Sequence, residues 1–338
     1  MSGWLERGAE IGLEVRLGGQ LVSADEVVWS AGPATATEFL SGNRARLLEV
    51  GSLELTATVG DRSGSRTIDV VLPPQILFDD RVGGNRDIYM TRLDGSDLVR
   101  LTEDPADDSD PTAGGGWTVF SSLRDGNAEL YALQDGMTGA QRLTETASDE
   151  RQPALSRGGT QLAFARSEGG GNRIWTRPLG GGPEDRVTDG LLAESGIEAS
   201  PSWDPQAERL VLMSTADGNA DIWSVSADGA AASLVVGTAQ AEVEPAWHPD
   251  EDRVVFAATI PGEDPELFLA DLAEGTTTRL TTRPGTEGQP AWLPDGRIVF
   301  TIWTESGTGL MWLDPAEPDV AYSIPVSGPL PQNPTGVH

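Results

Sequence analysis

The fold of this chain is decided by a stretch near its end that reads Pro290-Ala291-Trp292-Leu293-Pro294-Asp295-Gly296-Arg297-Ile298-Val299-Phe300. It consists of an apolar run, a Pro-Asp-Gly turn and a second apolar run that ends in an aromatic residue. Glycine after aspartate accepts the backbone angles that a tight turn between antiparallel strands requires. The stretch therefore predicts a β-hairpin.

The same proline-led hairpin recurs along the chain. Its prolines are Pro111, Pro153, Pro201, Pro245 and Pro290, at intervals of 42, 48, 44 and 45 residues. Each hairpin is followed by a third apolar run with an aromatic residue and by a short fourth run that closes in Arg-Leu-Thr or a related triplet. Units of four short strands that repeat every ~40 to 45 residues are typical of the blades of a β-propeller.

Six units are present, but only five contain the proline strand, because the first unit begins directly at Gln75-Ile76-Leu77-Phe78. The missing strand is expected at the C-terminus, where Pro334 follows Pro290 at the same spacing as the other blade prolines. The length of the segment 75–338 also fits six units of this size. The sequence therefore predicts an all-β protein whose six-bladed propeller, residues 75–338, is closed by a C-terminal strand, which leaves no open sheet edge.

This repeat, best kept between Pro290 and Phe300, resembles the propeller repeat of the TolB-like (PD40, WD40-like) family over about residues 75–338. The family includes periplasmic TolB-like propellers and the related propellers of prolyl oligopeptidase-type and tricorn proteases. The resemblance implies an extracytoplasmic protein of the bacterial envelope, periplasmic or at the cell surface, that docks a protein or peptide partner. The Trp-Asp and Gly-His signatures of eukaryotic WD40 blades are absent.

Residues 1–72 lack the repeat of the later units and contain short alternating segments separated by Gly, Ser and Asp turns. This pattern predicts a small β-sandwich, joined to the propeller through Pro73-Pro74. The segments Val28-Trp29-Ser30, 55–60 and 68–70 resemble those of bacterial immunoglobulin-like domains, which predicts an Ig-like fold.

Composition excludes several classes of function. The 53 acidic residues outweigh 23 arginines, and lysine is absent, so the formal charge of −30 argues against binding to nucleic acid or anionic lipid. The lack of cysteine excludes disulfides, thiolate nucleophiles and sulfur-ligated metals. No apolar run is long enough to form a membrane-spanning helix, and residues 1–10 lack the pattern of a signal peptide. The chain is therefore expected to be cytoplasmic or to have had a targeting segment removed.

The sequence offers no nucleophilic active site. Its two histidines, His248 and His338, are too few for a His-rich zinc site, and no Gly-x-Ser-x-Gly motif is present. His248 occupies a slot that Asp204 and Leu293 fill in other units, so the slot tolerates very different side chains. We therefore expect no catalytic residues, although paired carboxylates for glycosidic or lyase chemistry remain formally open.

Acidic residues recur three positions before the blade prolines. If the proline strands are innermost, these carboxylates are expected to form an acidic ring at one mouth of the central channel, with two further acids directly before prolines. Three interpretations are open: hydrogen bonds to local backbone amides, a Ca²⁺ or other hard cation, or docking of a basic or amino-terminal partner segment. The five recurring acids, which are also the candidate cation ligands, are Asp108, Glu150, Glu198, Glu242 and Glu287, and the two further acids are Asp110 and Glu244.

Other motifs are expected to be structural. The turns 125–129 and 217–221 place oxygen-bearing residues at alternate positions, as at the start of a calcium loop, but Asp-Gly and Gly-Asn pairs are also what a hairpin requires. The recurring aromatic residues are expected to pack between blades, whereas Trp4 and Trp303 fall outside the repeat and are candidates for exposed contacts. The recurring set is Trp117, Trp203, Trp247 and Trp292 on the inner strand, and Tyr89, Tyr131, Trp175, Trp223, Phe268 and Trp312 on the third strand.

These features favour a non-enzymatic module of the bacterial cell envelope that binds a protein, peptide or other ligand at the channel mouth. Loops 190–198 and 260–264 depart from the repeat and are further candidates for contact with a partner. One alternative is a carbohydrate- or peptide-active hydrolase or lyase that uses a metal or paired carboxylates at the mouth. A second is a structural component of a surface or matrix that acts in adhesion.

Overall fold

The computed structural model describes residues 4–7, 9–17, 20–41, 44–49, 51–137, 139–193, 196–326 and 328–337. Nearly all regular structure in these residues is β-strand, which confirms the predicted all-β class. The chain divides into two compact units, residues 1–73 and 74–338. Among the described residues no helix has the length and apolar character needed to cross a lipid bilayer.

The first unit contains a four-stranded sheet in the order β1-β9-β8-β5 and a three-stranded sheet in the order β2-β7-β6. Its core contains the buried side chains of Leu47, Leu53, Leu55, Ile68 and Val70. The alternation of apolar and polar residues places these side chains on one face of their strands. The strands are β1 (Trp4–Glu6), β2 (Glu10–Gly12), β5 (Val28–Gly32), β6 (Thr37–Leu40), β7 (Arg44–Leu47), β8 (Gly51–Val59) and β9 (Arg62–Val71), with the short pair β3 (Arg16–Leu17) and β4 (Gln20–Leu21) beside them.

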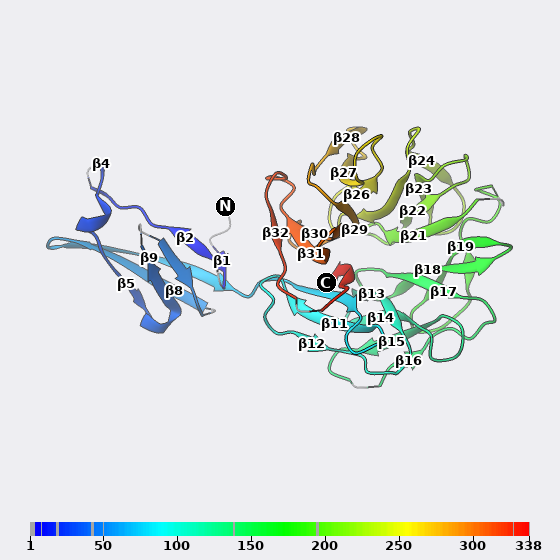
Figure 1. Cartoon of the computed structure of the whole chain (residues 1–338), viewed down its shortest axis with the longest axis horizontal. Coiled ribbons are helices and arrows are strands. Elements are labelled where there is room, and N and C mark those ends of the chain that lie inside the picture. Colours follow the sequence, from blue (N-terminus) through cyan, green and yellow to red (C-terminus); the bar gives the residue numbers. More distant parts are fainter. Residues whose placement is uncertain are drawn as a thin grey trace. The chain divides into compact units, whose positions relative to one another are not determined.

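The second unit is a propeller of six four-stranded antiparallel sheets, and Figure 1 shows these blades arranged around a centre. From the innermost to the outermost strand, the blades are as follows: blade 1, β33 (Gln332–Gly336), β10 (Gln75–Asp80), β11 (Asp87–Arg92) and β12 (Val99–Arg100); blade 2, β13 (Asp108–Gly114), β14 (Trp117–Ser122), β15 (Glu129–Gln134) and β16 (Gln141–Arg142); blade 3, β17 (Glu150–Leu155), β18 (Gln161–Glu168), β19 (Gly171–Pro178) and β20 (Asp185–Arg186); blade 4, β21 (Glu198–Trp203), β22 (Arg209–Ser214), β23 (Asp221–Ser226) and β24 (Ala232–Val236); blade 5, β25 (Glu242–Trp247), β26 (Arg253–Ala258), β27 (Glu266–Asp271) and β28 (Thr276–Arg279); and blade 6, β29 (Thr286–Trp292), β30 (Ile298–Thr304), β31 (Gly307–Leu313) and β32 (Ala321–Ser323).

The C-terminal strand closes the ring, as the sequence predicted. β33 pairs antiparallel with β10, with Ile76 opposite Gly336 and Leu77 opposite Thr335. The red C-terminal end of the chain lies at the centre of the propeller in Figure 1. Gly336 is required there, because a Cβ at this position would lie 2.6 Å from the carbonyl oxygen of Trp292 in blade 6. The last strand therefore completes the first blade and packs against the sixth.

Apolar clusters fill the spaces between blades. The second strands of five blades carry a fully buried phenylalanine, and these residues are Phe78, Phe120, Phe164, Phe256 and Phe300. In blades 1, 2 and 5 this ring stacks on the aromatic ring of the third strand, with centroids 5.7 to 6.2 Å apart. These rings belong to apolar clusters that combine residues of two neighbouring blades, so the recurring aromatic residues contribute to packing between blades, as expected.

One predicted aromatic position was wrong, and a second has an unusual orientation. Trp117 lies on the second strand, β14, because the turn at Gly115 and Gly116 precedes it. Trp312 lies on the third strand, as predicted, and packs against the apolar cluster of blades 6 and 1. In blade 6 it is Met311 that lies opposite Phe300, whereas Trp312 lies opposite Val299 and therefore points to the other face of the sheet. Trp312 stacks there on Tyr322, with ring centroids 4.4 Å apart.

Candidate functional site

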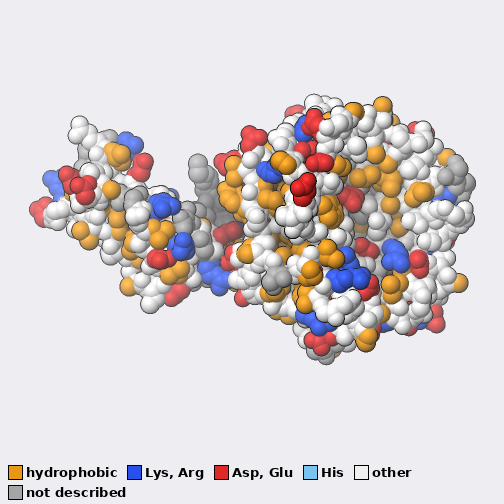
Figure 2. Space-filling view, in the orientation of Figure 1, with side chains coloured by type: hydrophobic (Ala, Val, Ile, Leu, Met, Phe, Trp, Pro, Cys, Tyr) orange, Lys and Arg blue, Asp and Glu red, His pale blue; other side chains and the backbone are white. Residues whose placement is uncertain are grey.

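The inner strands surround a central cavity of about 340 Å³. The residue after each proline faces this cavity and is small in every blade, which leaves the space open. These six small residues are Thr112, Ala154, Ser202, Ala246, Ala291 and Thr335. On the face of the propeller shown in Figure 2, basic and acidic side chains lie together near the centre. The propeller thus contains a polar channel large enough to admit a side chain or a short peptide end.

The residue before each proline also lines the cavity, and we call these six residues the channel ring. All six have a left-handed backbone, with φ between 50° and 54°, and each inner strand shifts its register there. This conformation is costly for residues other than glycine, and strain of this kind gathers at binding sites. The channel ring consists of Asp110, Gln152, Ser200, Glu244, Gln289 and Asn333.

Side chains of the channel ring link neighbouring blades. The backbone N–H of Ser200 donates to the Gln152 side chain at 3.0 Å, that of Gln289 to Glu244 at 2.6 Å, and that of Asn333 to Gln289 at 3.0 Å. The N–H of Gln152 donates in the same way to Asp110. Among the described residues the Ser200 hydroxyl makes no such bond. The bulged backbone therefore points the N–H of a channel-ring residue toward the ring residue of the preceding blade, whose side chain accepts the hydrogen bond.

Asp79 completes this hydrogen-bonded belt in blade 1. Its carboxylate accepts from the backbone N–H of Asp110 at 3.1 Å and from the Asn333 side chain at 2.6 Å, and it forms an ion pair with Arg86. Burial raises the pKa of Asp79 to about 6, although Arg86 opposes the shift. The belt therefore contains a carboxyl group that gains a proton under mildly acidic conditions.

Asp110 and Glu244 are the two carboxyl groups of the channel ring. They belong to blades 2 and 5, which are separated by two blades in either direction around the ring. Burial raises the pKa of both groups, while hydrogen bonds from the backbone N–H groups of Gln152 and Gln289 oppose this shift. Partly desolvated carboxylates on opposite sides of a channel favour binding of a cationic group between them.

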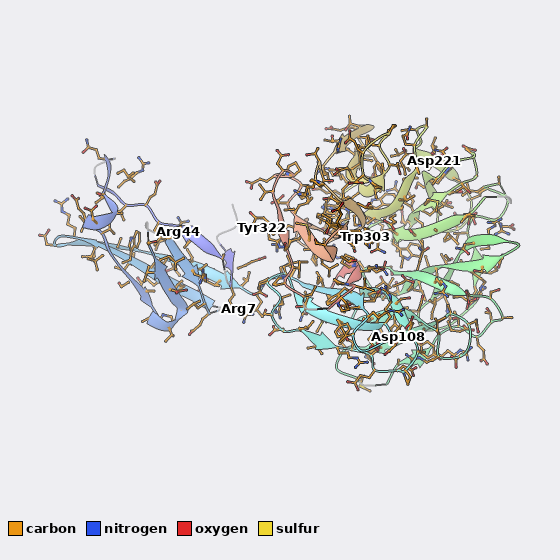
Figure 3. The ribbon with its side chains drawn as sticks, viewed as in Figure 1. Arg7, Arg44, Asp108, Asp221, Trp303 and Tyr322 are labelled. Carbon is orange, nitrogen blue, oxygen red and sulfur yellow. The ribbon has the colours of Figure 1, made fainter. Side chains whose placement is uncertain are left out.

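One mouth of the channel carries charged side chains of both signs. A second cavity of about 270 Å³ opens beside the channel ring between blades 1, 2 and 3, and Arg86, Arg151, Asp107 and Asp110 line it. Across the mouth, Trp303 approaches the Cα of Gly288 so closely that a Cβ there would lie 3.1 Å from the indole. Figure 3 shows Trp303 near the centre of the propeller. Trp303 is half-buried and packs beside Gly288, next to the channel-ring residue Gln289. Its availability for contact with a partner stays a prediction.

At the other end, Arg157 reaches across the channel. Its guanidinium donates to the carbonyl of Pro249 at 3.2 Å and to the carboxylate of Asp250 at 2.5 Å. Arg157 belongs to blade 3 and Asp250 to blade 5, so this contact passes over the intervening blade 4. Arg157 therefore narrows this end of the channel.

The predicted acidic ring has to be corrected. Asp108, Glu150, Glu198, Glu242 and Glu287 are at most 2% exposed and do not line the channel cavity. They lie inside the blade junctions because the register shift before each proline turns them away from the channel. Only Asp110 and Glu244, of the seven predicted residues, face it.

The buried acids have local partners, as in the simplest of the three interpretations. Glu198, for example, accepts from the backbone N–H of Ile174 at 2.9 Å and from the Thr188 hydroxyl at 2.6 Å. Asp108 and Glu150 form ion pairs with arginines. Within the described ranges, no group of three or more Asp, Glu or His side chains is placed to hold a metal ion. The five acids therefore do not gather around one cation.

His248 has a structural setting. Its Nδ1 accepts from the backbone N–H groups of Asp250 and Glu251, and its ring lies edge-on to Trp292 at 4.4 Å. Burial lowers the pKa of His248. His338 and the side chain of Trp4 lie outside the described residues, as do residues 194–195 of the loop 190–198.

Sequence reasoning missed most of the channel ring. It selected acids, although the shared signal is a polar residue directly before every blade proline. It also missed Asp79 on the second strand of blade 1, because the residues at the equivalent position of the second strand are small or apolar in most other blades. Repeat position, rather than residue charge, would have identified Gln152, Gln289 and Asn333.

The belt predicts opposite effects for two glycine substitutions. Ser200→Gly removes the cost of a left-handed serine without removing a belt bond, so we expect stabilisation of up to about 1 kcal/mol. Gln152→Gly also deprives the Ser200 N–H of its acceptor, and we expect a net destabilisation of about 1 to 2 kcal/mol. Urea unfolding of both variants measures this difference, and equal effects would contradict the belt.

Asp79 predicts a pH dependence of stability. Its folded-state pKa of about 6 lies above the ordinary value of 3.8, so the folded protein binds the proton more tightly than the unfolded chain does. The resulting stabilisation, about 3 kcal/mol, is complete below pH 4 and is lost as the pH rises through 6. A carbon-13 titration of aspartate carboxyls should show a midpoint near pH 6 that is missing in Asp79→Asn. If no such resonance disappears, the assignment is wrong.

Comparisons with known proteins agree with this architecture. Residues 74–239 match the family model described as the TolB beta propeller domain. The fold is similar to that of TolB from Acinetobacter baumannii (TM-score 0.70, 11% identity, 92% of this chain and 83% of that chain) and of a putative TolB from Agrobacterium tumefaciens (0.61, 15%, 77% and 90%). It is also similar to a puromycin-hydrolysing peptidase of Mycobacterium tuberculosis (0.53, 13%, 93% and 52%). No curated protein matches the sequence significantly.

The solved structures share only 11% to 15% sequence identity with this chain and therefore show the fold alone. The family match lies entirely within the propeller and begins at its first residue, before β10. Six blades, the closing C-terminal strand and this match lead to one conclusion: the second unit of the chain is a TolB-like β-propeller.

Proposed function

We propose that the chain is a non-enzymatic binding module of the bacterial cell envelope, and that it docks the end of a protein or peptide at the mouth of the propeller channel. The observation that carries the proposal is the channel ring. It combines a cavity of about 340 Å³, a strained backbone and two carboxyl groups on opposite blades. A site of this kind suits an amino-terminal or basic segment, whose positive charge Asp110 and Glu244 would balance.

The mouth also offers complementary groups for the rest of a peptide. Arg86 and Arg151 line the neighbouring cavity, and Trp303 stands on the side of blade 6. An arginine-lined pocket and an indole are groups that recur at the centres of protein interfaces. An extracytoplasmic location is part of the proposal, since the TolB-like family that the propeller matches includes periplasmic propellers.

A binding role is preferred to catalysis because the channel carboxyls are not arranged as a pair. Asp110 and Glu244 lie on opposite blades, and each accepts a backbone N–H from the neighbouring blade. The similarity to a peptidase is a similarity of fold, and this chain spans about half the length of that protein.

The experiment selects binding peptides on the wild-type protein from a library with free amino termini, and measures their affinities by calorimetry. We expect selected peptides to carry a basic residue or to require the free amine. The double variant Asp110→Asn/Glu244→Gln should weaken binding at least tenfold, because the amides keep the ring's acceptors but remove its charge.

Glu274→Gln is the matched control, since it removes one exposed carboxylate from the β27–β28 turn, on blade 5 but away from the channel ring. It should leave the affinity unchanged. If the double variant binds as tightly as the wild type, the channel is not the docking site and the proposal fails.

A further inference from the structure

Buried carboxyl groups meet in pairs at four of the junctions between blades. One comes from the first residue of a third strand and the other from the first residue of the next inner strand or a residue close to it, and each is at most 4% exposed. Two desolvated carboxylates in one place are unstable unless a cation or a proton compensates them. The pairs are Asp87 with Asp108, Glu129 with Glu150, Asp221 with Glu242, and Glu266 with Glu287.

At three of these junctions an arginine of the outer strand compensates the first carboxylate. Arg100 contacts Asp87 at 2.6 Å, Arg142 contacts Glu129 at 3.0 Å, and Arg279 contacts Glu266 at 3.2 Å. Each of these arginines stands opposite the central aromatic residue of the third strand. The arginine of the Arg-Leu-Thr triplet therefore has a defined electrostatic role.

A second arginine compensates the other carboxylate at the same three junctions. Arg124 contacts Asp108 at 2.9 Å, Arg166 contacts Glu150 at 2.8 Å, and Arg283 contacts Glu287 at 3.4 Å. Each of these three junctions thus holds two carboxylates and two guanidinium groups, so that every carboxylate of these pairs has an arginine partner.

The junction between blades 4 and 5 lacks both arginines. Leu234 stands opposite Trp223, where the outer strands of blades 1, 2, 3 and 5 have arginine. Ala258 stands opposite Glu242, where blade 3 pairs Arg166 with Glu150. Among the described residues, no arginine forms an ion pair with Asp221 or Glu242. Figure 3 shows Asp221 on a different part of the propeller from Asp108.

The two carboxyl groups at this junction remain underpartnered. Asp221 and Glu242 are 4% and 2% exposed and contact each other, and the Oδ1 of Asp221 has no hydrogen-bond partner among the described residues. Glu242 accepts from Thr238, through the hydroxyl at 2.5 Å and the backbone N–H at 3.3 Å. One oxygen each of Glu129, Glu150, Glu266 and Glu287 is also unpartnered among the described residues, but those carboxylates have guanidinium partners. A buried carboxylate pair without a counter-charge identifies a place where a positively charged group would be stabilised.

We propose that the junction between blades 4 and 5 binds a hard cation, Ca²⁺, through Asp221 and Glu242, in the position that arginine side chains fill at the other paired junctions. Carboxylate oxygens are the ligands that such a cation prefers, and neutral oxygens such as the Thr238 hydroxyl and water complete its shell. Since the described residues offer no third acidic or histidine ligand, binding is weak, with a dissociation constant of about 10⁻⁴ to 10⁻³ M.

The test follows thermal unfolding of the whole chain as CaCl₂, MgCl₂ or KCl replaces tetramethylammonium chloride at constant ionic strength. Constant ionic strength is needed because simple screening of the net charge of −30 also changes stability. We expect 10 mM Ca²⁺ to raise the midpoint of unfolding by about 3 °C or more, and calorimetry to give one site per chain. Mg²⁺ and K⁺ should have smaller effects, because they suit a different coordination shell.

The decisive variant is Leu234→Arg, which supplies the missing guanidinium. This variant should raise the midpoint of thermal unfolding in Ca²⁺-free buffer, and Ca²⁺ should no longer change that midpoint. Asp221→Asn should have the same two effects. Val99→Arg is the matched control, because it adds the same charge to an exposed site on the outer strand of blade 1. That variant should keep the full response.

Two results would overturn the proposal. If Ca²⁺ does not change the midpoint of the wild type, the carboxyl groups share a proton instead of a cation. If Leu234→Arg and Asp221→Asn respond to Ca²⁺ as the wild type does, the cation binds elsewhere. Both results are independent of peptide binding at the channel, so this proposal and the proposed function can fail separately.

Discussion

The pairing of β33 with β10 is the constraint on which the rest of the propeller depends. Each blade exposes the backbone groups of an inner strand to the channel and buries its faces against two neighbours. Without β33, β10 would become an unpaired edge and Trp292 would lose its neighbour at Gly336. The chain therefore holds its circle together by joining the first and last strands of the propeller sequence.

Closure also determines the geometry of the channel. Because the inner strand of blade 1 comes from the tail, Asn333 can take its place in the channel ring and connect Gln289 to Asp79. The belt of hydrogen bonds then passes from blade 6 to blade 1 and on to Asp110 in blade 2. The same bulge that forms the ring turns the preceding acids into the blade junctions. The bulge before each blade proline, repeated six times, thus places some carboxyl groups in the channel and the others in the junctions between blades.

The sequence predicted the propeller because its signals are local and repeated. Prolines, Asp-Gly turns and alternating apolar runs each specify a strand or a turn, and the missing sixth proline strand indicated closure by the tail. The acidic ring could not be predicted correctly from spacing, since the left-handed residue before proline breaks the alternation that assigns side chains to faces. The balance of charge at the junctions depends on cross-strand neighbours such as Arg166 and Ala258, which become visible only with the registers.

Complementation by the tail tests closure most directly. A chain that ends at Leu330 lacks β33, and a synthetic peptide of residues 329–338 can be added back. The account predicts a truncated chain with a strongly lowered unfolding midpoint, which the peptide restores in a saturable way and which a peptide with Gly336→Val does not restore. A truncated chain that unfolds at the midpoint of the full-length protein, with no response to the peptide, would contradict the closed ring.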